Sequence, residues 1–307
     1  MTKAGPKKLE YVRCNLCGSR NFTLYLKSPD TKLKGALFST TSQAVSGERL
    51  VRCRVCGLIF VNPRLTERKI ISSYEKGDES TYTLEAKARA RTFRHSLRII
   101  KKYKNKGKLL DVGCAAGFFL KEAQTAGFEV LGVEPNRNLS SWGFKNLGVR
   151  ILGGSFEKFR FPAKSFDVIS FWDTLEHFCD PLSALRKANS LLKREGIVVV
   201  NYPDINSHSA RIFGKNWWFI TSGHLFYFSE TTLRRALSQA GFEVKESRPH
   251  TQLLSVAYLI HQIGRYNRKL AKHLYSIACF MGLERILVPY RAGQRMFIAR
   301  KKAGHKN

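Results

Sequence analysis

The stretch KLLDVGCAAGFFL, residues 108–120, joins a short apolar run to a turn of small residues and then to a second apolar run. The first run is typical of a strand and the second of a helix. A glycine-bearing turn between them leaves backbone N–H groups at a helix N-terminus, where a nucleotide-like ligand can bind. The same turn could equally serve only to pack the helix tightly against the strand.

Strand-like and helix-like segments alternate on the C-terminal side of this turn. The apolar runs are LLDV, FEVLGVE, VRIL, FDVISFW and GIVVVNYP, and the helical stretches between them include FLKEAQTAG and PLSALRKANSLLK. TTLRRALSQAGFEVKESR adds a helix and a strand, and RAGQRMFIARKK adds a final strand. This pattern of βαβ units predicts an α/β domain with a doubly wound, mostly parallel sheet between two layers of helices.

The glycine spacing restricts the ligand of the turn. Gly113 and Gly117 flank Ala115, whereas a dinucleotide fingerprint needs GxGxxG. No Walker lysine follows the turn, so a phosphate-binding loop has little support either. An acid, Asp111, lies inside the strand just before the turn.

DVGCAAG resembles motif I of the class I S-adenosylmethionine-dependent methyltransferases, DxGxGxG. The resemblance implies a Rossmann-like fold with a seven-stranded sheet. It also implies a cofactor-binding loop that contains Asp111, Gly113, Cys114, Ala115 and Gly117, with Asp111 organising the loop and the methionyl amino group. Ala115 departs from the commonest form, and its methyl group is tolerable at negative φ but crowded at positive φ.

Two further segments fit the same family. LGVEPN places Glu134 and Pro135 at the end of the second strand, where the resemblance implies a carboxylate that binds the two ribose hydroxyls. Ser155 and Phe156 align with the positions that contact the adenine. Serine is a weaker match there than aspartate, while Phe156 is expected to stack on or flank the base.

SFDVISFWDTLEHFCDP resembles the fourth-strand motif of ubiquinone-pathway O-methyltransferases. The resemblance implies that Trp172 and Asp173 line the cleft between cofactor and acceptor. For a hydroxyl acceptor the enzyme must also remove a proton, and histidine suits that task. The candidates are His177 in LEHF and His224 in GHLFYFS, and His224 could instead be a structural hydrogen-bond hub.

Four cysteines form two CxxC pairs, Cys14 with Cys17 and Cys53 with Cys56, each followed by glycine. Two such pairs can complete a tetrahedral four-sulfur site, so a structural zinc ion is expected rather than a catalytic one.

The chain divides into three predicted parts. Residues 1–65 form a zinc-ribbon-like module, 66–107 a basic helical linker or cap, and 108–307 the methyltransferase domain. Two insertions interrupt this domain: an aromatic one at 204–228 and a helical one at 250–290, the latter with basic residues that include Arg265. Insertions at the C-terminal edge of such a sheet usually shape the substrate site.

The composition indicates an anionic partner. The 307 residues carry a formal net charge of +30, which favours a phosphorylated, nucleotide-linked or lipid-linked acceptor, with peripheral membrane contact or nucleic acid as further alternatives. The basic segment from Lys87 to Lys108 is either a polyanion-binding patch or a solvated helix face. The N-terminus lacks the apolar core of a signal peptide and no run reaches membrane-spanning length, so we expect a cytoplasmic protein, peripheral at most to the inner face of the membrane.

Three functions remain open from the sequence. The leading one is an S-adenosylmethionine-dependent methyltransferase of a small-molecule, glycan or lipid-linked precursor, most simply an O-methyltransferase. The second is an RNA methyltransferase. The positive charge favours it, but the sequence contains neither an NPPY-like motif nor a catalytic-cysteine motif. The third is a non-catalytic membrane-surface or scaffold protein that retains the fold, which the departures at Ala115 and Ser155 would suit.

Overall fold

The computed structural model describes residues 9–27, 49–75, 85–221, 223–264, 267–291 and 293–302. Most of the linker between the cysteine pairs, residues 76–84 and Arg265 lie outside these ranges. Within them, no helix combines the length and the hydropathy needed to cross a membrane.

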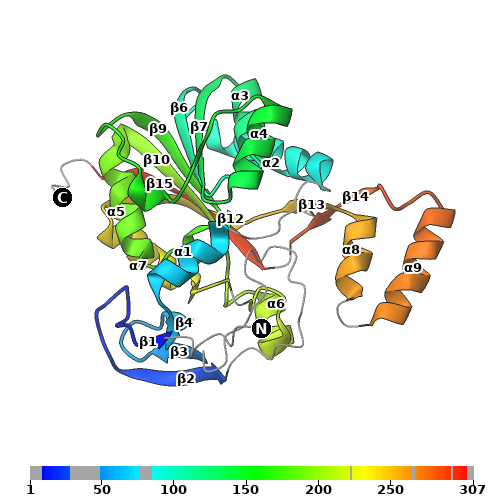
Figure 1. Ribbon diagram of the computed structural model, residues 1–307, viewed down its shortest axis with the longest axis horizontal. Helices are drawn as coiled ribbons and strands as arrows, with labels where there is room; N and C mark the ends of the chain where they lie inside the picture. The colour runs from blue at the N-terminus through cyan, green and yellow to red at the C-terminus, as the bar shows by residue number, and fades with distance from the viewer. Residues whose placement is uncertain are drawn as a thin grey trace, which may run out of the picture.

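A seven-stranded sheet with the order β12-β15-β10-β9-β6-β7-β8 forms the centre of the molecule (Figure 1). β15 is antiparallel to both of its neighbours, while β10, β9, β6, β7 and β8 run parallel to one another. The strands are β6 (Gly107–Val112), β7 (Phe128–Glu134), β8 (Ile151–Gly153), β9 (Phe166–Trp172), β10 (Leu192–Pro203), β12 (Phe242–Pro249) and β15 (Gln294–Lys301). The predicted Rossmann-like, mostly parallel fold is confirmed.

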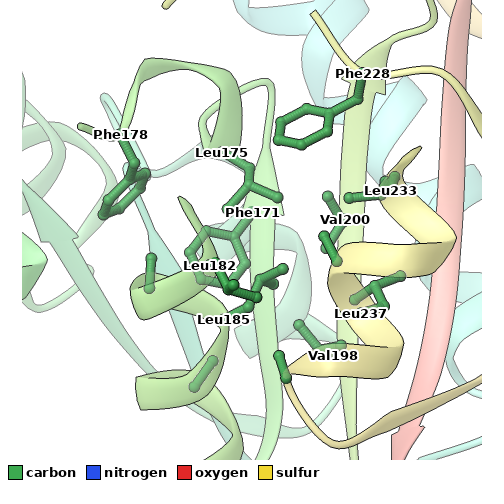
Figure 2. Packing of buried hydrophobic residues seen from close by; sticks show 14 of the residues in the cluster. Phe171, Leu175, Phe178, Leu182, Leu185, Val198, Val200, Phe228, Leu233 and Leu237 are labelled. Atoms are coloured by element: carbon green, nitrogen blue, oxygen red, sulfur yellow. The ribbon is translucent and has the colours of Figure 1, made fainter. Parts of the chain in front are cut away.

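Helices cover both faces of this sheet because its strands are apolar on both sides. One layer consists of α2 (Ala86–Ile100), α3 (Phe118–Thr125) and α4 (Arg137–Leu147), and the other includes α5 (Pro181–Leu191) and α7 (Glu230–Gln239). In β10, Val198 and Val200 pack toward α5 and α7, whereas Ile197 and Val199 pack toward α2 and α3. Figure 2 shows the first of these clusters, with Phe171 from β9 beside the α5 side chains.

The cysteine-bearing segment pairs with the later chain. β2 (Phe22–Lys27), β3 (Arg49–Cys53) and β4 (Ile59–Val61) form a four-stranded sheet with β11 (Phe226–Tyr227), which comes from the aromatic insertion. β4 and β11 are antiparallel, with Phe60 opposite Phe226. β1 (Leu9–Glu10) pairs with β5 (Arg64–Leu65), and α1 (Glu67–Glu75) follows. The N-terminal segment and the insertion therefore share one sheet and one core.

The helical insertion is more than a helix pair. Its ends form an antiparallel ribbon of β13 (Gln252–Ser255) and β14 (Leu287–Tyr290), and between them lie α8 (Val256–Ile263) and α9 (Arg268–Phe280). The remaining elements are short: α6 (His208–Phe213) and the 3-10 turns η2 (Phe156–Lys158), η3 (Leu175–His177) and η4 (Gly214–Asn216).

Candidate functional site

A cavity opens at the carboxyl ends of β6, β7, β9 and β10, where the predicted site residues converge. Strand-end residues that line it include Val112, Glu134, Asp173 and Asn201. Helices α1 and α2, together with β13 and the first turn of α8, contribute a further part of its wall. The carboxyl ends of parallel strands are where doubly wound folds bind ligands.

The glycine turn adopts the left-handed backbone that it needs. Gly113 has φ +70° and Gly117 φ +78°. A side chain at Gly113 would collide with Thr174, so the loop packs closely against the segment after β9. Ala115 has φ +48°, so the negative φ at which an alanine is comfortable there is not found. This conformation costs a non-glycine residue about 1–2 kcal/mol.

Glu134 holds that strained turn. One carboxylate oxygen accepts a hydrogen bond from the Ala115 N–H at 2.8 Å and the other accepts one from the Asn136 N–H at 2.8 Å. Burial raises the pKa of the Glu134 carboxyl to about 7, although these two hydrogen bonds act in the opposite direction. Each oxygen keeps a second lone pair, so the carboxylate fits the vicinal ribose diol that the sequence predicts for it.

The predicted adenine-contacting residues also line the cavity. Phe156 is buried, and the Lys187 Nζ lies 4.5 Å from the centre of its ring. The buried Ser155 hydroxyl has no hydrogen-bond partner among the residues that the structure describes. A buried hydroxyl is costly to leave unpaired, so Ser155 suits a polar ligand edge. Pro135 lies beside them in the wall.

Three residues of the predicted loop lie behind the wall. Asp111, Cys114 and Gly117 are not among the described residues that line the cavity. Asp111 is buried, accepts a 2.6 Å hydrogen bond from the Ser170 hydroxyl, and its pKa is raised to about 8 by burial. Its geometry supports the loop from below and gives no indication of direct contact with a ligand amino group.

Asp173 and Trp172 lie at the end of β9, as predicted, and both line the cavity. The Asp173 carboxylate accepts hydrogen bonds from Asn201 at 2.8 Å and from Gln294 at 2.6 Å. Burial raises the pKa of Asp173 to about 6, although Gln294, the Arg89 charge and Asn201 oppose this. Asp173 is therefore held in place by two fixed amides at the centre of the cavity wall.

The two candidate histidines pack edge to face, with ring centres 4.7 Å apart and ring planes 79° apart, and only one of them lines the cavity. His177 lines the cavity, whereas the buried His224 does not. The His177 Nδ1 lies 2.8 Å from the carbonyl oxygen of Gly223 and 2.9 Å from the hydroxyl of Tyr74. A carbonyl can only accept, so Nδ1 carries the hydrogen and Nε2 is the nitrogen that can accept a proton. Burial lowers the pKa of His177 to about 4, which keeps the ring neutral at physiological pH.

Glu176 was not identified as a site residue from the sequence. Its carboxylate is buried without a hydrogen-bond partner in the described structure, and burial raises its pKa well above the usual range. Glu176, His177 and His224 place ligand atoms within 4.8 Å of one another, a donor set that can hold a divalent cation. In the sequence, the LEH tripeptide indicated His177 but not its contact with His224. The two histidines lie 47 residues apart in the chain and meet only through tertiary packing.

The wall also contains residues that the sequence analysis did not single out, some of them in the insertion at 250–290 that it expected to shape the substrate site. Tyr74, Arg89 and His250 line it, together with Ile70, Ile71, Phe93, Leu253, Leu254 and Tyr258. His250 is buried, and its Nε2 lies 3.1 Å from the Ser96 hydroxyl of α2. Arg89 belongs to the basic segment. It lies on the face of α2 that lines the cavity, whereas its neighbour Arg91 is exposed to solvent.

The four predicted cysteine ligands converge. Sγ of Cys14 lies 3.4 Å from that of Cys56, and Sγ of Cys17 lies 3.5 Å from that of Cys53, with all four within 4.8 Å of one another. Thiolates around a tetrahedral zinc ion lie about 3.8 Å apart, so the donor set and its spacing fit that ion. Gly18 and Gly57 follow the pairs with φ +72° and +79°, as the tight turns require.

A family model described as a methyltransferase domain matches residues 84–247. Among curated proteins, the ubiquinone biosynthesis O-methyltransferase of Azorhizobium caulinodans is 26% identical over 51% of this chain and 66% of its own length. That of Actinobacillus pleuropneumoniae is 33% identical over 30% of this chain and 43% of its own length. This chain thus spans less than two thirds of these relatives.

Solved structures show the same fold. An S-adenosylmethionine-dependent methyltransferase from Thermotoga maritima aligns with a TM-score of 0.51 at 23% identity, covering 73% of this chain and 96% of that one. A chain from the Haloferax volcanii complex of the Trm112 methyltransferase activator with a methyltransferase aligns with a TM-score of 0.54 at 14% identity, covering 75% and 97%.

Proposed function

Because the chain belongs to the methyltransferase-domain family of class I S-adenosylmethionine-dependent enzymes, we propose that it methylates a hydroxyl of a small-molecule acceptor bound in the cavity. One observation carries the proposal. A single cavity is lined both by the glycine turn with Glu134 and by Asp173 with His177. The residues suited to the cofactor and the group suited to proton removal therefore face one space.

Different residues of the cavity would bind the cofactor and remove the proton. Glu134 would hold the ribose, with Ser155 and Phe156 at the adenine, and the bound cofactor supplies an activated methyl group. The chain itself must orient the acceptor and remove its proton. His177 suits this step because Gly223 fixes Nδ1 as the protonated nitrogen and leaves Nε2 to accept the proton. His224 packs against His177 but does not line the cavity, which favours a supporting role.

The acceptor wall favours an apolar molecule with one anionic group. Ile70, Leu253 and Tyr258 represent its apolar part, while Arg89 is the only Lys or Arg among the described lining residues. Arg89 therefore suits a carboxylate or phosphate on the acceptor. The names of the relatives in ubiquinone biosynthesis support O-methylation as the reaction type.

We assign the four-cysteine site to structural zinc. All four donor positions would be filled by protein, which leaves no open position for substrate. The ion would hold the sheet that β11 shares with β4, and so it would stabilise the segment that carries Gly223 and His224.

Calorimetry with S-adenosylmethionine tests the binding half of the proposal. The wild type should bind, and Glu134→Gln should bind at least about tenfold more weakly, as expected for a lost charge-assisted hydrogen bond. Glu129→Gln is the matched control, because Glu129 lies on the same strand but is exposed and paired with Lys108. No binding at millimolar cofactor would overturn the proposal in favour of a non-catalytic protein.

Methyl transfer from labelled cofactor to a panel of hydroxylated carboxylates tests the second half. His177→Ala should lower kcat by about 100-fold or more while the cofactor affinity stays unchanged. Transfer to RNA but not to the panel would instead support the RNA methyltransferase alternative.

A further inference from the structure

The segment 256–286, here called the α8–α9 arm, stands away from the central sheet at the end of the β13–β14 ribbon (Figure 1). Few residues pack between its two helices. Ile260 of α8 meets Ala271 and Ala278 of α9, with Val256 and Leu274 beside them. The core between the two helices is therefore small.

The outer surface of the arm is apolar where a solvated helix would be polar. Leu270, Ile277 and Met281 are exposed, and their spacing of seven and four residues puts them on one face of α9. Phe280, at the end of α9, is 93% exposed. Such a row of large apolar side chains marks a surface that a partner covers.

Cations occupy the other face of α9, because the helical period places Arg268 and Lys272 opposite the apolar row and Lys269 between them and the row. Arg268, Lys269 and Lys272 are exposed, and none of them pairs with a carboxylate in the described part of the chain. The sequence of the arm contains five Lys or Arg residues and one acid, Glu284, which pairs with Arg285. Helix α9 therefore has an apolar row on one face and a basic polar face, the pattern of a helix that lies in the plane of a membrane interface.

We propose that the α8–α9 arm docks on an anionic lipid bilayer surface. A bilayer takes the apolar row into its interface, and its anionic headgroups attract the cations of the polar face. A nucleic acid would use the cations but would leave Leu270, Ile277 and Met281 in water. A second copy would cover the apolar row, but it carries the same net charge of +30 and would offer the cations no complementary charge.

Docking also orients the cavity. Tyr258, in the first turn of α8, lines the cavity, and the Ser255 hydroxyl that caps this helix hydrogen-bonds to Glu85 at the start of α2 at 2.9 Å. A bilayer beneath the arm would thus lie near the acceptor wall, which would suit a lipid-borne acceptor. This consequence rests on the proposed function, whereas the docking itself does not.

Co-sedimentation of the full chain with vesicles tests the docking. Binding is expected to vesicles of phosphatidylcholine with phosphatidylglycerol, to be weak to phosphatidylcholine alone, and to weaken as salt is added. The triple variant Arg268→Gln, Lys269→Gln, Lys272→Gln should lower the partition coefficient by about two orders of magnitude. The double variant Ile277→Ser, Phe280→Ser should lower it by at least about tenfold.

Controls of equal chemistry come from the body of the protein. Arg91→Gln, Arg98→Gln, Lys102→Gln removes three exposed cations of the α2 region, and Phe144→Ser removes an exposed aromatic side chain of α4. Both should bind vesicles as the wild type does. The proposal is overturned if the arm variants bind normally, if the controls lose binding equally, or if the arm variants only abolish a dimer seen by light scattering. Unchanged cofactor binding in the arm variants separates this outcome from a failure of the proposed function.

Discussion

The hydroxyl of Tyr74 lies 2.9 Å from Nδ1 of His177, although 103 residues separate them in the sequence. The same hydroxyl donates a hydrogen bond to the carbonyl of Gly223 at 2.9 Å, the carbonyl that also accepts from His177. Helix α1, the turn after β9 and the loop before β11 thus meet at one carbonyl group, and together they fix the orientation of the imidazole.

Removal of the Tyr74 hydroxyl should therefore loosen the proton acceptor without touching the cofactor. We expect Tyr74→Phe to lower kcat roughly three- to tenfold, the value of one hydrogen bond, while the cofactor KM stays unchanged. Tyr103→Phe is the control, because Tyr103 is hydrogen-bonded to Glu246 and does not line the cavity. Steady-state kinetics would contradict a positioning role if the two variants behaved alike.

Asp111 should make the ligand-free protein less stable as pH rises. Its carboxyl ionises near pH 3.8 in the unfolded chain, whereas burial raises its pKa in the folded protein to about 8. Between these values the folded state holds a proton that the unfolded state has lost, so the free energy of unfolding falls with increasing pH. Asp111→Asn should remove up to about one proton from this slope in urea titrations.

Asp167 is a control residue, because its pKa is shifted in the opposite direction. Burial acts to raise its pKa, but Lys193 at 2.7 Å and the Lys108 N–H hold it below the usual range. The stabilisation that Asp167 gives to the folded state is present at neutral pH and is lost as the pH falls through the lowered pKa. Asp167→Asn should therefore leave the slope between about pH 6 and pH 8 unchanged. A wild-type slope that survived Asp111→Asn intact would contradict the assignment.

Loss of the four-cysteine site should destabilise more than the N-terminal segment. Because β4 pairs with β11, we expect Cys53→Ser or removal of metal by a strong chelator to lower the midpoint of thermal unfolding in one cooperative transition. Elemental analysis should give one zinc ion per chain for the wild type and less for the variant. Cys279→Ser, at an exposed cysteine outside the cluster, should change neither quantity.

Arg89 should determine the preference for anionic acceptors. Arg89→Gln should raise the KM of a carboxylate-bearing acceptor at least about tenfold and leave that of its uncharged amide analogue nearly unchanged. Arg91→Gln, two residues along α2 and exposed, should have no such effect. Equal losses for the charged and uncharged acceptors would indicate a packing role for Arg89 instead.

The sequence by itself determined the sheet, the glycine turn and the two cysteine pairs, since these depend on local signals. Strand and helix periodicity is written into consecutive residues, and the left-handed turns at Gly113 and Gly117 need residues that tolerate positive φ. Ala115 shows the limit of this reasoning, because a hydrogen bond to Glu134, 19 residues away, supports a conformation that its residue type disfavours.

Only the tertiary structure decided which side chains share the cavity. Tyr74, Arg89 and His250 carry no motif, and they reach the cavity because α1, α2 and the β13–β14 ribbon fold over the carboxyl ends of the strands. The same packing decided that His177 faces the cavity and His224 lies behind it, although both follow equally suggestive motifs. Spacing along the chain fixes periodicity and turns, whereas contacts between distant segments fix burial, pKa and access.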